Sequence, residues 1–295
     1  MGWRDGYIAV DWGTTNRRAY RLDKSGALLD EFADDHGLMA VPAGGFDRAV
    51  TEIREQLGDY PMLLAGMVGS NKGWREAPYV ACPADVHDLT EAILWVEPGR
   101  TGIVPGVSQQ GQAGADVMRG EEVQVLGAAA RGLVPADTTI CHPGTHAKWI
   151  RMEEGRIASF RTMMTGEMFS LLTEHSILAD QLAGEAQVDG SFYAGVAEAL
   201  AGGDLLPGLF RVRAGQLLGE GFDNPASYAS GLLIGCDVRT GLALGKDDGM
   251  IALVGRLDLC ALYAAALTQA GRETTQLDGE AAFLAGIASL TEMLS

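Results

Sequence analysis

The sequence predicts an α/β protein with two lobes, and three observations lead to this prediction. The chain has 295 residues, enough for two domains at about 100–200 residues each. Short apolar runs typical of buried strands alternate with stretches that have helical spacing. A unit made of a strand, a Gly-Thr turn and a second strand occurs twice, around Gly13-Thr14 and around Gly144-Thr145. Such a duplication predicts two similar lobes with a ligand cleft between them.

In the first half, residues 7–10 form an apolar run that predicts a buried strand. Residues 18–22 predict a second strand, which leads into a turn at residues 24–26. Apolar side chains recur with helical spacing over residues 46–57, which predicts a helix. The remaining elements predicted in this half are a strand at 62–68 and a helix at 121–132.

The second half begins with a similar pattern. A strand predicted at 137–141 leads into the second Gly-Thr turn, and a further strand is predicted at 148–152. After a tight turn at Glu154-Gly155 comes a strand at 157–161.

The last third is rich in Ala, Leu and Gly and predicts mostly helices, with one strand at 250–254. We therefore expect two domains, residues 1–135 and residues 136–295, each carrying one Gly-Thr turn.

The composition limits the classes of partner. With 39 acidic against 22 basic residues, the formal net charge is −17. The phosphates of nucleic acids and anionic lipid headgroups repel such a chain, so we expect no nucleic-acid partner and no membrane partner. If the ligand is an anion, the site must supply local cations or backbone N–H groups. The 40 glycines let the backbone approach a ligand closely.

The start of the chain and its cysteines predict a cytoplasmic protein. The first eleven residues contain Arg4 and Asp5 and no long apolar run, unlike a signal peptide. The cysteines are scattered and lack the spacing of a zinc site, which predicts reduced thiols; they are Cys82, Cys141, Cys236 and Cys260.

The two Gly-Thr turns suit an anion such as a phosphate. Because Gly13 has no Cβ, backbone N–H groups can approach the anion, and the hydroxyls of Thr14 and Thr15 add donors. Asp11 ends the preceding strand, where a carboxylate can hold a Mg²⁺ ion that bridges phosphate oxygens. The alternative is an ordinary hairpin turn, since Asp and Gly are common in turns. The sequence contains no P-loop, no convincing Rossmann glycine motif and no Gly-x-Ser-x-Gly.

These residues and several others carry a family resemblance. The segment Asp11-Trp12-Gly13-Thr14-Thr15-Asn16 resembles the first phosphate hairpin of the actin/hexokinase/Hsp70-like ATPase superfamily. Four further segments resemble the 2-dehydro-3-deoxygalactonokinases, and the resemblance extends from about residue 7 to the C-terminus. These segments are 66–70 with Gly73-Trp74 and 76–79, then 116–122, 143–149 and 160–167.

The resemblance implies a fold and an activity. The fold would consist of two ribonuclease-H-like lobes of the actin-like ATPase and sugar-kinase type with an interlobe cleft. The activity would be ATP- and Mg²⁺-dependent phosphorylation of the 6-hydroxyl of 2-dehydro-3-deoxy-D-galactonate in galactonate catabolism. The first domain would carry the substrate side and the second domain the adenosine side, with Gly255 at the turn against adenosine.

The second phosphate hairpin departs from the superfamily pattern. The superfamily opens this hairpin with Asp-x-Gly, whereas this chain has His142-Pro143-Gly144. Metal handling would therefore fall more heavily on Asp11, and Lys148 could offset phosphate charge. Phosphate contacts are expected from Gly144 and from two further residues of this hairpin, Thr145 and His146, although His146 could also be an ordinary turn residue.

Phosphoryl transfer to an alcohol benefits from a carboxylate that accepts the hydroxyl proton. The candidates are Asp116, Glu121 and Glu122, with Glu167 as a fallback. At least one of the first three is expected to be a solvated acid at a helix start, where the helix dipole favours it. We favour Asp116 because related sugar kinases use Asp, and we keep Glu121 as the second candidate.

The implied substrate is a carboxylate, which Arg side chains bind in a bidentate manner. Arg18, Arg119 and Arg161 are the candidates, and a structural ion pair is the alternative for each. Asn16 and Ser70 are candidates for reading substrate hydroxyls, with ordinary loop polarity as their alternative. A kinase for another sugar or sugar acid and a nucleotide-binding regulatory ATPase remain alternative functions, and a homodimer is compatible with the sequence.

Overall fold

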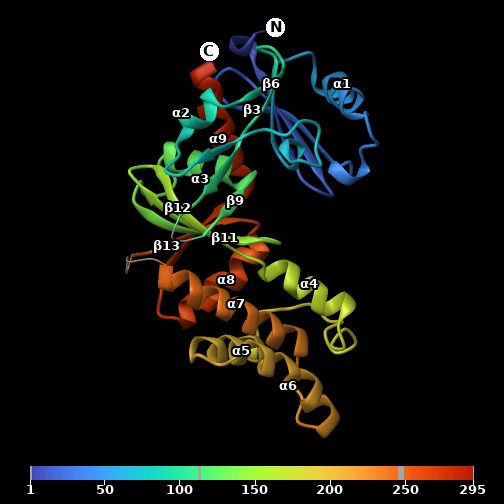
Figure 1. Cartoon of the computed structure of the whole chain (residues 1–295), viewed down its shortest axis with the longest axis vertical. Helices are drawn as coiled ribbons and strands as arrows, with labels where there is room; N and C mark the ends of the chain where they lie inside the picture. The colour runs from blue at the N-terminus through green and yellow to red at the C-terminus, as the bar shows by residue number, and fades with distance from the viewer. Residues whose placement is uncertain (1, 112–113, 245–248, 295) are drawn as a thin grey trace. The chain divides into compact units, whose positions relative to one another are not determined.

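The computed structural model describes residues 2–111, 114–244 and 249–294, and the chain divides into two compact units (Figure 1). The first unit contains Met1–Asp137, Met152–Ser159 and Glu280–Ser295, and the second contains Thr138–Arg151 and Phe160–Gly279. The sequence analysis placed residues 152–159 and 280–295 in a second domain, whereas they cluster with the first unit. The substrate and adenosine sides assigned to the two domains stay predictions.

A six-stranded mixed sheet forms the centre of the first unit. Its strands are β1 (Tyr7–Trp12), β2 (Arg17–Leu22), β3 (Leu28–Asp34), β4 (Met62–Gly66), β6 (Leu94–Glu97) and β7 (Thr101–Ile103). Their order is β3-β2-β1-β4-β7-β6. β1, β2 and β3 pair antiparallel, whereas β4 lies parallel to β1 and β7 lies parallel to β4. All of β4 is buried, as expected for a parallel strand covered on both faces.

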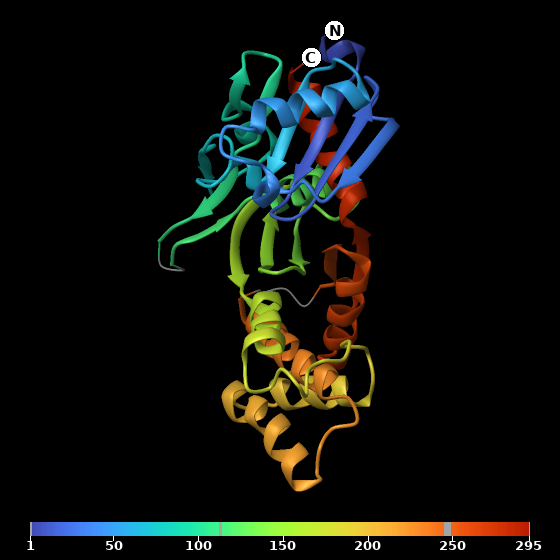
Figure 2. The ribbon, with the colours of Figure 1, turned by 90° about the vertical axis from the view of Figure 1, so that its right-hand side faces the viewer.

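Helices cover both faces of this sheet (Figure 2). α1 (Phe46–Leu57) has the predicted bounds and buries Val50, Ile53 and Leu57 in the core of the sheet. α9 (Gly279–Leu294) lies on the opposite face, where the Phe283 ring packs 6.0 Å from the Tyr20 ring. α3 (Glu121–Ala130) crosses α9 so closely that a Cβ on Gly127 would lie 2.4 Å from the Cα of Gly286. This close packing of glycines holds the C-terminal helix in the first unit.

The rest of the first unit is built from shorter elements. They are β5 (Tyr79–Ala81), β8 (Gly106–Gln109) and β9 (Asp116–Met118), which form a three-stranded sheet, together with the helix α2 (Val86–Glu91) and the 3₁₀ turns η1 (Trp3–Asp5), η2 (Leu38–Ala40) and η3 (Met67–Gly69). The strand predicted at 62–68 ends at Gly66, because Gly66 has a φ of +90° and opens the turn η3.

The second unit repeats the arrangement of the first sheet. The strands of its sheet are β10 (Thr138–His142), β11 (Ala147–Glu153), β12 (Arg156–Met163), β13 (Ile251–Gly255) and β14 (Thr274–Asp278). The end of β11 and the first half of β12 belong to the segment 152–159, which clusters with the first unit. The order β12-β11-β10-β13-β14 matches β3-β2-β1-β4-β7, and β13 is again parallel to the strand that precedes the Gly-Thr turn. The duplication predicted from the two Gly-Thr turns is thus present in the sheet topology. β14 was not predicted, since its sequence is short and polar.

Helices make up most of the last third, as predicted. They are α4 (Thr165–His175), α5 (Gly190–Leu200), α6 (Leu205–Leu218), α7 (Pro225–Leu244) and α8 (Leu257–Gln269). α5 and α7 pack through small residues: a Cβ on Gly231 would lie 2.1 Å from the carbonyl oxygen of Phe192, and one on Gly235 would lie 2.7 Å from the Cβ of Ala199. These two glycines therefore serve helix packing.

Two further observations bear on the sequence predictions. The four cysteines are free thiols, and Cys141 and Cys260 are buried. Within residues 2–111, 114–244 and 249–294, no helix has the length and apolar character needed to cross a membrane.

Candidate active site

The first Gly-Thr turn connects β1 to β2. Hydrogen bonds that its backbone carbonyl groups accept hold the turn in place. The N–H of Gly13 donates to the Asn16 carbonyl at 2.9 Å. The carbonyls of Gly13, Thr14 and Thr15 accept from the amides of residues 37–39 at 3.0–3.1 Å. In the part of the chain that the structure describes, the amides of Thr14 and Thr15 donate to no acceptor, and both residues are exposed. The turn therefore presents amides and hydroxyls to an anion.

Asp11 lies on β1, one residue before the end of the strand, and is directly paired with Arg18 on β2. Burial of its carboxyl raises the pKa of Asp11 from 3.8 to about 6; Arg18 opposes this shift and Glu121 adds to it. Gly66 lies beside this carboxyl, since a Cβ there would make an ordinary contact of 3.6 Å with Asp11 Oδ1. The structure thus brings Asp11, Arg18 and Glu121 together, so an acidic pair faces one cation.

The start of α3 carries the second acid of this group. Glu121 Oε2 accepts from the Arg119 amide at 3.1 Å. Gly120 has a φ of +108°, and a Cβ there would lie 3.3 Å from the Cα of Gly66, so the turn before α3 packs directly onto the end of β4. This contact between Gly120 and Gly66 accounts for the proximity of Glu121 to Asp11.

Glu122 is fully buried, which the sequence analysis did not predict. Its two carboxyl oxygens accept from the Gly120 amide at 2.9 and 2.7 Å. Burial and the neighbouring Glu121 raise the pKa of Glu122 to about 8, which favours the protonated carboxyl. Asp116 lies on β9 of the small sheet, where its Oδ1 accepts from the Val117 amide at 2.9 Å.

Arg119 contacts the segment that follows η3. Its Nη2 donates to the Ala77 carbonyl at 2.8 Å, and its guanidinium lies 4.3 Å from the centre of the Tyr79 ring. A Cβ on Gly69 would lie 2.9 Å from Arg119 Nη1. Ser70, the next residue, is buried. Arg119 and Ser70 therefore belong to one neighbourhood in the first unit, whereas Arg161 lies on β12 and Asn16 is exposed in the first turn.

The second Gly-Thr turn, between β10 and β11, packs on the first turn of α4. A Cβ on Gly166 would lie 2.6 Å from the Gly144 carbonyl oxygen, and the Glu167 amide donates to the Thr145 carbonyl at 2.9 Å. The Nε2 of His146 lies 2.5 Å from Glu167 Oε2. The sequence analysis considered His146 and Glu167 separately and did not predict this pair.

Lys148 follows the second turn on β11 and is buried. Its Nζ donates to the His146 carbonyl at 2.9 Å. His142, which stands where the superfamily has an acid, is the last residue of β10. The structure therefore places Lys148 at this turn, and its role in offsetting phosphate charge stays a prediction.

A pocket of about 850 Å³ adjoins the second turn within the second unit. Its walls combine apolar side chains with a few polar groups, the usual composition of a small-molecule site; they include Gly144, Thr165, Gly166, Phe169, Ser230, Leu233, Asp258, Leu262 and Tyr263. Gly255 ends β13 with a φ of +148°, and a Cβ there would lie 3.5 Å from the Pro143 carbonyl oxygen. Gly255 thus lies between the second turn and the start of α8.

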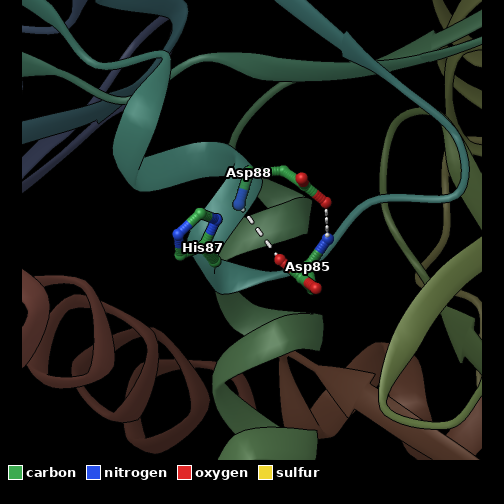
Figure 3. Close-up of side chains that lie close together, drawn as sticks. All are labelled: Asp85, His87 and Asp88. Carbon is green, nitrogen blue, oxygen red and sulfur yellow. Dashed lines mark hydrogen bonds between the residues drawn. The ribbon is translucent and has the colours of Figure 1, made fainter.

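Asp85, His87 and Asp88 form a separate group of possible metal ligands, with ligand atoms within 4.8 Å of one another (Figure 3). The Asp88 amide donates to Asp85 Oδ1 and the Asp85 amide donates to Asp88 Oδ2, each at 3.0 Å. Arg156 forms ion pairs with both carboxylates. These contacts form a capping box at the start of α2, and we assign this group to helix capping.

The duplicated sheet and its two Gly-Thr turns define the class of protein, an α/β protein with the actin-like ATPase and sugar-kinase fold. The activator of 2-hydroxyisocaproyl-CoA dehydratase from Clostridium difficile, solved with bound ADPNP, shares this fold at a TM-score of 0.52. Its sequence is 10% identical, and the match covers 98% of this chain and 95% of that chain. The predicted fold class is thereby confirmed.

Comparison with more similar proteins identifies the family within this class. The chain belongs to the 2-keto-3-deoxy-galactonokinase family, whose model matches residues 11–290. It is 36% identical to the 2-dehydro-3-deoxygalactonokinase of Escherichia coli K12 over 98% of both chains. A crystal structure of a candidate 2-dehydro-3-deoxygalactonokinase from Sinorhizobium meliloti matches with a TM-score of 0.90 and 33% identity, over 97% of this chain and 98% of that chain. The family resemblance found in the sequence is confirmed.

Proposed function

We propose that the protein transfers the γ-phosphoryl group of ATP to the 6-hydroxyl of 2-dehydro-3-deoxy-D-galactonate. The observation that carries this proposal is the 36% identity to a 2-dehydro-3-deoxygalactonokinase over 98% of both chains. The placement of Asp11 and Glu121 beside the turn at Gly13 supplies the acidic group that such a reaction uses. The pocket beside Gly144 and the turn at Gly255 have the position and composition expected for the adenosine of the nucleotide.

The residues around Asp11 fit a Mg²⁺ ion. Mg²⁺ prefers carboxylate oxygens and binds through one or two carboxylates together with substrate phosphates. The pKa of Asp11 is raised because burial and Glu121 outweigh Arg18, so a further cation would compensate the ionised carboxylate. When bound there with ATP, Mg²⁺ would neutralise charge on the phosphate oxygens. Asp11 is the residue that we propose to hold it.

The other residues bind and orient the reactants. The amides and hydroxyls of Thr14 and Thr15 would donate to phosphate oxygens, and Gly13, which has no Cβ, would let the anion approach them closely. The turn at Gly144, Thr145 and His146 would supply further donors. Lys148 would add positive charge near the second turn. The substrate O6 attacks the γ-phosphorus, the bond from that phosphorus to the β–γ bridging oxygen breaks, and ADP leaves with that oxygen. The proton from O6 passes to a carboxylate.

Two carboxylates are the candidates for that proton acceptor. Glu121 lies close enough to Asp11 to raise its pKa, whereas Asp116 belongs to the small sheet and binds the adjacent amide. This arrangement favours Glu121, although the sequence favoured Asp116. For the substrate carboxylate, the proposed cations are Arg18, Arg119 and Arg161, with Asn16 and Ser70 as hydroxyl-reading groups.

An ADP-release assay with a panel of sugar acids tests the proposed function. We expect Mg²⁺-dependent turnover with 2-dehydro-3-deoxy-D-galactonate and a product phosphorylated at O6, as read by ³¹P–¹H NMR. Faster turnover with another sugar acid would reassign the substrate. Nucleotide binding without turnover on any acceptor would instead favour a regulatory ATPase.

Substitution of Gly166 tests the second turn as a phosphate site. In Gly166→Ala the new Cβ would stand 2.6 Å from the Gly144 carbonyl oxygen and 2.8 Å from the Thr145 Cα, so the turn must move. We expect the KM for ATP to rise about tenfold or more, with the KM for the sugar acid unchanged. Gly190→Ala is the matched control, because nothing lies within 4 Å of a Cβ at that helix start. Equal KM values for ATP in the two variants would contradict the assignment.

A further inference from the structure

The mechanism above leaves one buried carboxylate of the second unit without a role. Asp237 lies in the middle of α7 and is buried. Its Oδ1 accepts from the Trp149 indole N–H at 2.5 Å, and its Oδ2 accepts from the Tyr263 hydroxyl at 2.6 Å and from the Thr165 hydroxyl. One carboxylate thus joins α7 to three other elements, β11, α4 and α8.

Two of the three donors belong to the wall of the pocket next to the second Gly-Thr turn. Thr165 and Tyr263 line the pocket, whereas Asp237 does not. Trp149 is on the strand that follows the turn. α7 approaches the Trp149 indole closely, since a Cβ on Gly241, one helical turn after Asp237, would lie 2.0 Å from the ring. Asp237 therefore lies behind the pocket wall and bonds to the elements that form it.

A neutral side chain of the same size cannot accept all three of the hydrogen bonds that the buried Asp237 carboxylate accepts. A buried charge is costly unless it is well hydrogen-bonded, and the three donors supply that compensation. An Asn side chain offers one carbonyl oxygen and places an N–H₂ donor where the second acceptor was. Asp237→Asn would therefore leave at least one buried donor without an acceptor, although the side chain keeps its size.

We propose that Asp237 is a positioning residue for the nucleotide pocket: by accepting from Thr165, Trp149 and Tyr263, it holds the start of α4 against the second turn and Tyr263 in the pocket wall. The contact of Gly166 with Gly144 follows directly from the position of Thr165, its neighbour. This inference rests on the proposed function, because it takes the pocket as the site of the nucleotide. Asp237 itself touches neither nucleotide nor sugar acid.

The test measures MgADP affinity by calorimetry on the whole protein, together with KM values and thermal unfolding midpoints. We expect Asp237→Asn to weaken MgADP binding about tenfold and Tyr263→Phe to weaken it about fivefold, with the KM for the sugar acid within twofold of the wild-type value. Tyr228→Phe is the matched control. It also removes a buried hydroxyl that donates to a carboxylate, here Glu198 at 2.7 Å, and Tyr228 does not line the pocket.

The outcomes separate positioning from general stability. A positioning role requires that Tyr263→Phe weakens MgADP binding while Tyr228→Phe lowers the unfolding midpoint at unchanged affinity. Equal losses of affinity in the two Phe variants, or wild-type affinity in a folded Asp237→Asn protein, would overturn the inference. If Asp237→Asn does not fold, the comparison of the two Phe variants decides. A wild-type protein that does not bind MgADP would refute the proposed function and this inference with it.

Discussion

Replacement of Asp11 by Asn is expected to lower kcat by about 10³-fold or more and to leave the protein folded. The amide keeps the shape of the side chain but loses the charge that holds the metal ion, and metal-ion stabilisation of transferring phosphoryl groups is worth several kcal/mol. The ADP-release assay with Mg²⁺, ATP and 2-dehydro-3-deoxy-D-galactonate measures this loss. Asp30→Asn is the control, since Asp30 is an exposed acid on β3 of the same sheet. An active Asp11→Asn enzyme would contradict the metal role.

The same substitution is expected to stabilise the protein. Burial raises the pKa of Asp11 from 3.8 to about 6, so its ionisation above pH 6 destabilises the folded state. With allowance for partial exposure of the carboxyl, the penalty is about 2 kcal/mol. Urea unfolding of Asp11→Asn at pH 8 should give a free energy of unfolding higher by that amount. The difference should shrink as the pH falls from 6 toward the unfolded-state pKa of 3.8, and it should disappear below about pH 3, where Asp11 is protonated in both states.

The sequence was most informative where the signal is local. The apolar run before Asp11, the helical spacing of Phe46, Val50, Ile53 and Leu57, and the paired Gly-Thr turns depend only on neighbouring residues, and the structure confirms all three. The functional roles of the turn residues stay predictions.

Features that depend on tertiary packing were not predictable in this way. Glu122 looked like any acid at a helix start, yet it is fully buried, and it follows the point where Gly120 packs on Gly66, a contact between distant parts of the chain. Asp237 lies far along the chain from Trp149 and Thr165, so its three hydrogen bonds have no local signature. Placement of 280–295 in the first unit likewise depends on a contact between distant glycines.

Replacement of Glu121 by Gln is the second change with a large expected effect. If Glu121 accepts the proton from the substrate O6, kcat should fall about 10²- to 10⁴-fold, the usual contribution of general base catalysis. The KM for ATP should stay within a few-fold, because the Glu121 carboxylate accepts from the Arg119 amide, which lies outside both proposed phosphate turns. Asp116→Asn, the matched acid-to-amide change at the other candidate, should lower kcat no more than a few-fold. The reverse ranking in the ADP-release assay would assign the base to Asp116.

The pH profile of the Glu121→Gln variant adds a second test of the same arrangement. Glu121 raises the pKa of Asp11, so loss of its charge should let Asp11 ionise at lower pH. Since the proposed metal role requires ionised Asp11, the acid limb of kcat/KM should move to lower pH in the residual activity of Glu121→Gln. Asp116→Asn should leave that limb in place. An unshifted limb in Glu121→Gln would mean that the two carboxylates do not interact in the working enzyme, and the acidic pair would then lose its role in the mechanism.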